Sequence, residues 1–232
     1  MLAYRSAFSN EVETKWDDDI WTLHTDVRQS LAYFDDFISS VCQKLGATGY
    51  FLVFSPKTNF RHELCPTYKA NRKDKRKPLA LGEIISQVKL RHPSLVHENI
   101  EADDLIGVMC TRYPESNIAV SGDKDFATLP CTWYNFLKNE TTTRTEEEAD
   151  RNHLIQTLTG DATDGYQGIK GVGPKTAIKL LDKHGWNWDG VVDAYESKGL
   201  SEDEALLNAR LAYILRNHNL NDGEVTLWNP NS

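Results

Sequence analysis

The chain has 232 residues, of which 40% are hydrophobic and 26% charged, and this balance excludes an intrinsically disordered protein. Its length predicts one domain, or one domain with a small addition. No apolar run approaches the roughly 20 residues of a membrane helix, and no signal peptide follows Met1. The four cysteines lack the spacing of zinc ligands, so we expect reduced thiols and a cytoplasmic location without a membrane partner.

The formal net charge of −8 argues against a simple basic protein that coats nucleic acid. The charge is uneven, because residues 57–77 carry a net +6 and the rest of the chain carries −14. A polyanion would bind the first region, and cations would bind among the acidic residues elsewhere. A chain that needs both is more typical of a metal-dependent nuclease than of a simple binding protein.

Apolar periodicity predicts alternating helices and strands in the first part of the chain. Residues 16–45 carry apolar residues at steps of three and four, which predicts one long helix that Gly46 ends. The elements predicted after it are a strand at 50–54, a helix at 80–91, a strand at 94–97, a helix at 101–113, and strands at 117–121 and 132–136. This alternation predicts an α/β fold with a doubly wound, mostly parallel sheet, which binds ligands beyond the carboxyl ends of its strands.

The second part of the chain is predicted to be mostly helical. Two capping-box patterns, Thr145-x-x-Glu148 and Ser201-x-x-Glu204, predict helices that end near residues 158 and 217. A turn-rich stretch at 160–174 separates these helices, and a short strand is expected at 225–228.

Seven carboxylates occur in three groups near the expected ends of elements. The first group starts a helix, the second follows a strand, and the third lies in the turn-rich stretch. They are Glu101, Asp103 and Asp104; Asp123 and Asp125; and Asp161 and Asp164. If the seven converge they repel one another, so we expect hard divalent cations to neutralise them. The alternative is structural, because acidic residues at helix starts often act as caps and Asp-x-Asp often forms a turn.

Two Mg²⁺ or Mn²⁺ ions about 3.5–4 Å apart are the usual arrangement for phosphodiester hydrolysis. One ion helps to generate the attacking hydroxide, and the other stabilises the leaving oxygen. The acidic groups therefore predict a two-metal hydrolytic site.

The basic segment interleaves an aromatic residue with cations. Lys69 and Arg72 are three residues apart, so a helical turn would direct both at one phosphate, and Tyr68 would stack on a base. Arg61 is a further expected DNA contact. The cations at 73–77 are predicted to attract phosphate only in a general way, as a solvated basic loop does.

Residues 168–177, Gly-Ile-Lys-Gly-Val-Gly-Pro-Lys-Thr-Ala, are typical of the hairpin of a helix-hairpin-helix element. Gly171 and Gly173 allow close backbone approach and positive φ, and a proline suits the first turn of the following helix. The exposed amides at that helix start, with Lys175 and Thr176, would hold a DNA phosphate. The alternative is an ordinary turn that leads into a helix.

The order of these motifs resembles that of the flap endonuclease and 5′→3′ exonuclease superfamily, which includes the 5′-nuclease domain of DNA polymerase I. The motifs are Tyr-Lys-Ala-Asn-Arg, Glu-Ala-Asp-Asp, Ser-Gly-Asp-Lys-Asp-Phe, Gly-Asp-x-x-Asp-Gly and Gly-x-Gly-Pro-Lys-Thr-Ala. The resemblance extends over nearly the whole chain, and residues 16–21 and 225–230 look similar to single-domain exonucleases of short-tailed bacteriophages. It implies an α/β catalytic core at 1–145 with a basic arch at 57–78, and a helical DNA-binding region of helix-hairpin-helix type at 146–232.

The resemblance also implies a role for each residue of the site. The first metal ion would be held by Glu101, Asp103, Asp104 and Asp123, and the second by Asp125, Asp161 and Asp164. Lys69 and Arg72 would steady the scissile phosphate, and Tyr68 would contact the terminal nucleotide. The hairpin would hold the duplex, with a K⁺ ion on its carbonyls. The implied substrate is DNA at 5′ ends, flaps and nicks, or an RNA–DNA hybrid, cut by Mg²⁺-dependent hydrolysis that leaves a 5′-phosphate in phage replication or host-DNA breakdown.

Two departures from the family pattern bear on activity. The family has an aspartate in its first strand, just before a stretch that resembles residues 2–8, and here Met1 stands at that edge. We therefore expect an N-terminally shortened form of the protein. The family usually has another aspartate just after the second strand, where this chain has Ser55. These departures leave open a catalytically impaired DNA-binding module of the same fold. A ribonuclease of the related PIN fold is less favoured, because that group lacks the glycine hairpin.

Overall fold

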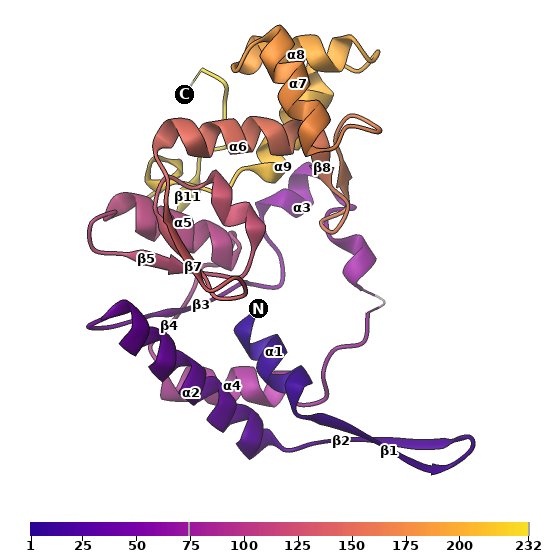
Figure 1. Cartoon of the computed structure of the whole chain (residues 1–232), viewed down its shortest axis with the longest axis vertical. Helices are drawn as coiled ribbons and strands as arrows, with labels where there is room; N and C mark the ends of the chain where they lie inside the picture. Colours follow the sequence, from indigo (N-terminus) through magenta and orange to yellow (C-terminus); the bar gives the residue numbers. More distant parts are fainter. Residues whose placement is uncertain (74, 232) are drawn as a thin grey trace. The chain divides into compact units, whose positions relative to one another are not determined.

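The computed structural model describes residues 1–73 and 75–231 (Figure 1). The chain forms two compact units, one made of residues 1–54 and 75–95 and the other of residues 55–73 and 96–231. This division differs from the predicted boundary at residue 145. The difference arises because the helix that begins at Glu146 packs against the 3₁₀ turn at 124–128 and the helix at 202–212, which belong to the same unit.

The first unit combines helices with a long β-hairpin. Its elements are α1 (Leu2–Ser9), β1 (Glu11–Asp17), β2 (Ile20–Thr25), α2 (Val27–Leu45), β3 (Leu52–Phe54) and α4 (Leu81–Arg91), followed by β4 (Ser94–Val96), which pairs with β3. Its core is formed by Ala7 of α1, Leu31 and Phe34 of α2, and Ile84 and Val88 of α4. Burial of these side chains holds the three helices together.

The predicted helix at 16–45 is wrong over its first residues. Residues 11–25 form an antiparallel hairpin, which extends away from α1, α2 and α4 (Figure 1). Aromatic and β-branched residues in this stretch favour paired strands over a helix. The side chain of Asp26 accepts hydrogen bonds from the amides two and three residues later, so α2 begins only at Val27. At the other end, Gly46 adopts a φ of 61° and ends the helix as predicted.

The second unit contains the remaining elements. They are α3 (Phe60–Leu64), the 3₁₀ turn η1 (Ala70–Arg72), α5 (Ala102–Arg112), β5 (Ile118–Val120), the 3₁₀ turn η2 (Lys124–Thr128), β6 (Thr132–Asn135), β7 (Glu140–Thr143), α6 (Glu146–Thr159), β8 (Gly160–Asp161), β9 (Tyr166–Gln167), α7 (Pro174–His184), α8 (Trp188–Glu196), α9 (Glu202–Ala212), the 3₁₀ turn η3 (Asn217–Asn219), β10 (Leu220–Asn221) and β11 (Glu224–Val225).

The largest described sheet of this unit is mixed. Strand β5 pairs in parallel with β6, and β6 pairs antiparallel with β7. The parallel pair, with helices before and after it, confirms the predicted α/β class. Strand β7 was not predicted, because Glu-Thr-Thr-Thr offers no alternation of apolar and polar residues.

The helical part of the second unit has its own core. Tyr195 of α8 and Leu181 of α7 are fully buried against Leu158 of α6, and the three helices lie together at one end of the unit (Figure 1). Both predicted capping boxes are confirmed, at Thr145 and Ser201. The last predicted helix ends at Ala212 rather than near residue 217, and the predicted strand at 225–228 is reduced to β11.

Within residues 1–73 and 75–231, no helix has the length and apolar character that crossing a membrane requires.

Candidate active site

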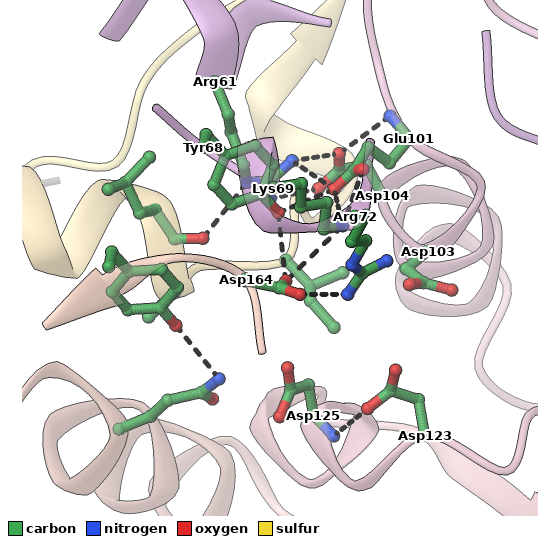
Figure 2. Close-up of a pocket in the computed structure, with 15 residues that line it drawn as sticks. Arg61, Tyr68, Lys69, Arg72, Glu101, Asp103, Asp104, Asp123, Asp125 and Asp164 are labelled. Atoms are coloured by element: carbon green, nitrogen blue, oxygen red, sulfur yellow. Dashed lines mark hydrogen bonds and ion pairs between the residues drawn. The ribbon is translucent and has the colours of Figure 1, made fainter. Parts of the chain in front are cut away.

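Six of the seven predicted carboxylates line one pocket of the second unit (Figure 2). They come from three separate segments and are Glu101, Asp103, Asp104, Asp123, Asp125 and Asp164. The same pocket is lined by four residues of the basic segment, namely Arg61, Tyr68, Lys69 and Arg72. The predicted convergence of acidic groups and phosphate-binding cations therefore occurs in the fold.

The start of α5 presents two carboxylates in different environments. Glu101 precedes the helix, and its carboxylate accepts hydrogen bonds from Lys69 Nζ at 2.7 and 2.9 Å. Burial acts to raise the pKa of Glu101, but Arg61 and Lys69 outweigh it and the pKa is lowered. Asp103 forms no salt bridge in the described chain. Burial, with repulsion from Asp123, raises its pKa to about 7.

Asp104 lines the pocket but is held in a buried ion pair with Arg61. Its two oxygens accept hydrogen bonds from the guanidinium of Arg61 at 2.6 and 2.8 Å, and its side chain has no exposed surface. The backbone amides of Glu101 and Leu215 also donate to it. All its oxygen lone-pair directions are therefore engaged by the protein, which conflicts with its predicted role as a metal ligand.

Arg61 is likewise placed differently from its predicted role in DNA binding. The residue is 2% exposed and donates to the carbonyl oxygens of Leu211 and Tyr213 as well as to Asp104. A guanidinium with these partners cannot reach a DNA phosphate without breaking a buried network. Arg61, Glu101 and Asp104 all line the pocket.

Lys69 and Arg72 reach the pocket through an unusual backbone turn. Lys69 has a φ of 55°, and η1 follows directly, so the predicted helical turn is a short 3₁₀ turn entered through a left-handed residue. The amide of Lys69 donates to the carbonyl of Asp164 at 2.7 Å. Lys69 Nζ lies 3.4 Å from the carboxylate of Asp164, and Arg72 forms an ion pair with the same carboxylate. Both cations thus line the acidic pocket, and their contact with a phosphate stays a prediction.

Tyr68 lies beneath these cations instead of presenting a free ring. The residue is 3% exposed, and its hydroxyl lies 2.9 Å from a Glu101 oxygen and 3.2 Å from an Asp164 oxygen. Burial is the main reason that its pKa is raised, so the phenol stays protonated and donates to one carboxylate at a time. The predicted stacking of Tyr68 on a base has no exposed ring face to support it.

The turn η2 presents the second pair of carboxylates, across the pocket from Glu101 and Asp104 (Figure 2). Asp123 begins the turn, and its side chain accepts a hydrogen bond from the amide of Asp125 at 3.0 Å. Burial, followed by repulsion from Asp123, raises the pKa of Asp125 to about 6. Both effects favour the neutral form of Asp125.

Asp161 is the one predicted carboxylate that does not line the pocket. It is buried, and Lys124 Nζ lies 3.0 Å from one of its oxygens, while the amides of Thr163 and Asp164 donate to the other. Burial opposes the effect, but the Lys124 hydrogen bond and charge lower the pKa of Asp161. This carboxylate holds the loop that carries Asp164.

In the part of the chain that the structure describes, no three His, Cys, Asp or Glu side chains are arranged as the ligands of a single metal ion. The donors still fit a hard divalent cation chemically, because every carboxylate offers oxygen and a bound cation would oppose the burial and repulsion that raise the pKa values of Asp103 and Asp125. The cations Lys69, Arg72 and Lys124 now neutralise the neighbouring carboxylates.

Comparison with known proteins identifies the family of this chain. The sequence model described as "5'-3' exonuclease, N-terminal resolvase-like domain" matches residues 2–158. The chain belongs to this exonuclease family. It is therefore a nuclease of the hydrolase class, which confirms the resemblance found in the motifs.

Two curated relatives show how the similarity is distributed. The exonuclease of Escherichia phage T7 is 30% identical, over 99% of this chain and 91% of the relative. DNA polymerase I of Bacillus caldotenax is 31% identical, over 69% of this chain and 21% of the polymerase. The nuclease thus matches a phage exonuclease along almost its full length.

Solved structures agree on the fold. The T5 D15 protein co-crystallised with metal ions has a TM-score of 0.65 and 18% sequence identity, with 78% of this chain and 82% of that chain covered. A T5 D15 flap endonuclease complex with DNA and metal ions has a TM-score of 0.64 and 19% identity, with 78% and 80% covered.

The glycine hairpin of this nuclease lies between α6 and α7, after the small β8–β9 pair. Gly171 has a φ of 79°, which only glycine adopts at little cost, and Gly173 precedes α7 with Pro174 in the first turn. Lys175 and Thr176 are exposed in that turn. The geometry agrees with an exposed helix start that is open to a phosphate, and DNA binding there stays a prediction.

Sequence reasoning missed several contributors to the pocket. Gln156 and Tyr166 line it, with Gln156 Nε2 donating to the Tyr166 hydroxyl at 3.3 Å. Neither lies in a motif with recognisable chemistry. At the position of the usual family aspartate, Ser55 Oγ accepts a hydrogen bond from the amide of Ala102 at 3.0 Å, so this residue faces the start of α5.

Proposed function

We propose that this nuclease hydrolyses phosphodiester bonds in DNA from 5′ ends and at flaps, with two Mg²⁺ or Mn²⁺ ions. The observation that carries this proposal is the meeting of six carboxylates with Lys69 and Arg72 in one pocket. Family membership supplies the direction of digestion, 5′ to 3′. The phage relatives support a role in phage replication or host-DNA breakdown, inside the host cytoplasm.

The carboxylates divide into two proposed ligand sets. Glu101, Asp103 and Asp123 would hold one ion, and Asp125 and Asp164, with Asp161 behind them, would hold the other. Asp104 is reassigned from ligand to partner of Arg61, because its oxygens are already engaged. Bound divalent ions would supply an activated water nucleophile and stabilisation of the leaving oxygen.

The cations of the pocket would bind the scissile phosphate when DNA enters. Lys69 and Arg72 now lie against Glu101 and Asp164, within reach of the same space that a scissile phosphate would occupy. A phosphate offers Arg72 the same forked geometry as a carboxylate does. Tyr68 would keep Glu101 and Asp164 oriented by donating its hydroxyl hydrogen to one of them.

The duplex beyond the site would be held by the glycine hairpin. Gly171 and Gly173 leave the backbone uncovered, and Lys175 and Thr176 stand at the start of α7, where backbone amides attract a phosphate. A K⁺ ion on the hairpin carbonyls belongs to this proposal, as does an RNA–DNA hybrid as an alternative substrate to nicked duplex DNA.

Cleavage assays on matched substrates test the proposal. We expect the protein to release 5′-labelled products from blunt, nicked and flap duplexes when Mg²⁺ or Mn²⁺ is present, and to stop when EDTA is added. A 3′-label should remain on the shortened strand. Release from the 3′ end first, or cleavage that persists in EDTA, would contradict the proposal.

A second candidate is a DNA-binding module with impaired catalysis, favoured by Ser55 at the usual aspartate position. The same assays separate the two, because such a module would retard the labelled duplex in a gel without cutting it. A protein that binds flaps tightly and leaves them intact in Mg²⁺ and in Mn²⁺ would establish this second candidate.

A further inference from the structure

An extended segment follows α9, and its residue Ile214 lines the pocket. Residues 213–217, which we call the strap, follow the last helical residue Ala212. Residues 213–216 are all buried although they are neither helix nor strand. The strap lies outside residues 2–158, which the family model matches. A buried irregular segment must satisfy its backbone groups with specific partners, and these partners show what the strap does.

One side of the strap is fixed to α5. The amide of Leu215 donates to Asp104 at 3.1 Å, and the amide of Asn217 donates to the hydroxyl of Thr111 at 2.8 Å. A Cβ atom at Gly107 would overlap the carbonyl oxygen of Leu215, so the strap lies directly against the helix backbone. These contacts fix the strap to the helix that follows Glu101 and carries Asp103.

The other side of the strap is fixed to η2 by Arg216. This residue is 4% exposed, and its Nη2 donates to the carbonyl of Thr128 at 3.2 Å and to Asp150 of α6 at 2.6 Å. Thr128 in turn donates its hydroxyl hydrogen to the carbonyl of Asp125 at 2.8 Å. A chain of two hydrogen bonds therefore connects Arg216 to the backbone of a proposed metal ligand.

We propose that Arg216 is a positioning residue that sets the separation between the carboxylates of α5 and those of η2. It touches neither the pocket nor a substrate, but it ties η2 to a strap that is already fixed to α5. Asp103 and Asp123 repel each other across the pocket, so the two elements need a fixed connection to keep their carboxylates within reach of shared ions. The inference rests on the proposed metal site.

Metal binding without DNA tests this role directly. Mn²⁺ titration by calorimetry would compare the wild type with Arg216→Gln, which removes the charge and the fork, and with Arg216→Lys, which keeps the charge. We expect Mn²⁺ affinity to fall about 10- to 100-fold in Arg216→Gln, the range seen when a residue that supports metal ligands is lost. Arg216→Lys should recover only part of it, because the lysine side chain is one atom shorter and does not reach the position of Arg216 Nη2, which donates to both Thr128 and Asp150.

Two further variants separate positioning from general stability. Arg151→Gln is the matched control, since Arg151 is an exposed arginine of α6 that pairs with Glu147 and lies far from η2 in the hydrogen-bond network. Its Mn²⁺ affinity should equal that of the wild type. Thr128→Val keeps Arg216 and Asp150 but removes the hydrogen bond to Asp125, and it should weaken Mn²⁺ binding several-fold with little change in melting temperature.

Each outcome decides the matter. If folded Arg216→Gln binds Mn²⁺ as tightly as the wild type, Arg216 has no positioning role. If Arg216→Gln does not fold, Thr128→Val and Arg216→Lys carry the test, and wild-type affinity in both would overturn the inference. A wild type that binds no Mn²⁺ would instead contradict the proposed function, and the two failures are thereby distinguished.

Discussion

Two sets of carboxylates in the acidic pocket differ in how their negative charge is balanced. In the first set, Glu101, Asp104 and Asp164 are each paired with a cation of the basic segment. In the second set, Asp103 of α5 and Asp123 and Asp125 of η2 form no salt bridge within the described residues, and the pKa values of Asp103 and Asp125 are raised. We call these sets the paired and the unpaired carboxylates.

This difference separates two tasks within one site. The unpaired carboxylates are the groups that a divalent ion would stabilise most, because no salt bridge within the described residues balances their charge. Among the paired carboxylates, Glu101 and Asp164 form ion pairs with Lys69 and Arg72, which we propose bind the phosphate, whereas Asp104 pairs with the buried Arg61. Substitutions in the two sets of carboxylates should therefore have different effects on cleavage, metal binding and stability.

The largest effect is expected at Asp123, one of the unpaired carboxylates. Asp123→Asn removes a charge that would hold a metal ion, while the asparagine oxygen can still accept the amide of Asp125, and cleavage should fall by about a thousandfold, equal to the several kcal/mol that a catalytic ion supplies. DNA binding should be nearly unchanged. Product release from a labelled flap, with Asp36→Asn as an exposed control, measures this. Full turnover by Asp123→Asn would exclude it as a metal ligand.

Substitution of Asp104 should mainly lower the free energy of unfolding. Asp104→Asn leaves Arg61 buried without its counter-ion, and loss of one partner of such a pair costs about 3–5 kcal/mol of unfolding free energy. Urea unfolding followed by circular dichroism checks the size of the effect. An Asp104→Asn protein that is as stable as the wild type but binds Mn²⁺ poorly would place Asp104 among the metal ligands after all.

Substitution of Lys69 tests whether this residue exchanges its carboxylate partner Glu101 for a phosphate when DNA binds. Lys69→Ala should lower the cleavage rate about 100-fold, comparable to the loss of one donor to a developing charge, while Mn²⁺ binding without DNA should not weaken. The reason is that Lys69 competes with a metal ion for Glu101 but assists the phosphate. Single-turnover cleavage and calorimetry measure the two effects. Weaker Mn²⁺ binding in this variant would contradict the exchange.

The lysines of α7 extend the comparison to cations without a carboxylate partner. Lys175 and Lys179 are exposed one turn apart, and neither forms a salt bridge in the described chain. If both contact duplex phosphates, the double change Lys175→Gln and Lys179→Gln should reduce the slope of log affinity against log salt by about 1.8. Filter binding of a blunt duplex at several salt concentrations gives this slope, with Lys198→Gln as the control.

The smallest effect is expected at Ser55, where a carboxylate can be added. Ser55→Asp places a negative charge at the start of α5, which the helix dipole favours, and beside the unpaired set. Mn²⁺ affinity should rise a few-fold. Calorimetry against Ser55→Asn, which adds a similar volume without charge, measures it. Equal affinities for the two variants would show that this position does not face the metal site.

The sequence predicted the site better than it predicted the elements around it. The carboxylates could be identified from the sequence because they occur in short acidic motifs, and six of them meet in one pocket. The buried pairing of Asp104 with Arg61 was not predicted, since burial of a charged pair depends on contacts with residues 211–215 that no local pattern reveals. Residues 16–25 of the hairpin were predicted as helix because apolar residues at 20, 23 and 27 also fit a helical period.

The strap has a consequence for how this enzyme can be divided. A fragment cut after residue 158 would contain every proposed ligand except Asp161 and Asp164, and it would still match the recognised N-terminal domain. It would also lack the amide of Leu215, which donates to Asp104 of α5, and the guanidinium of Arg216, which donates to Thr128 of η2. The N-terminal domain is therefore not an autonomous module here, and fusions or domain exchanges should keep the junction beyond residue 217.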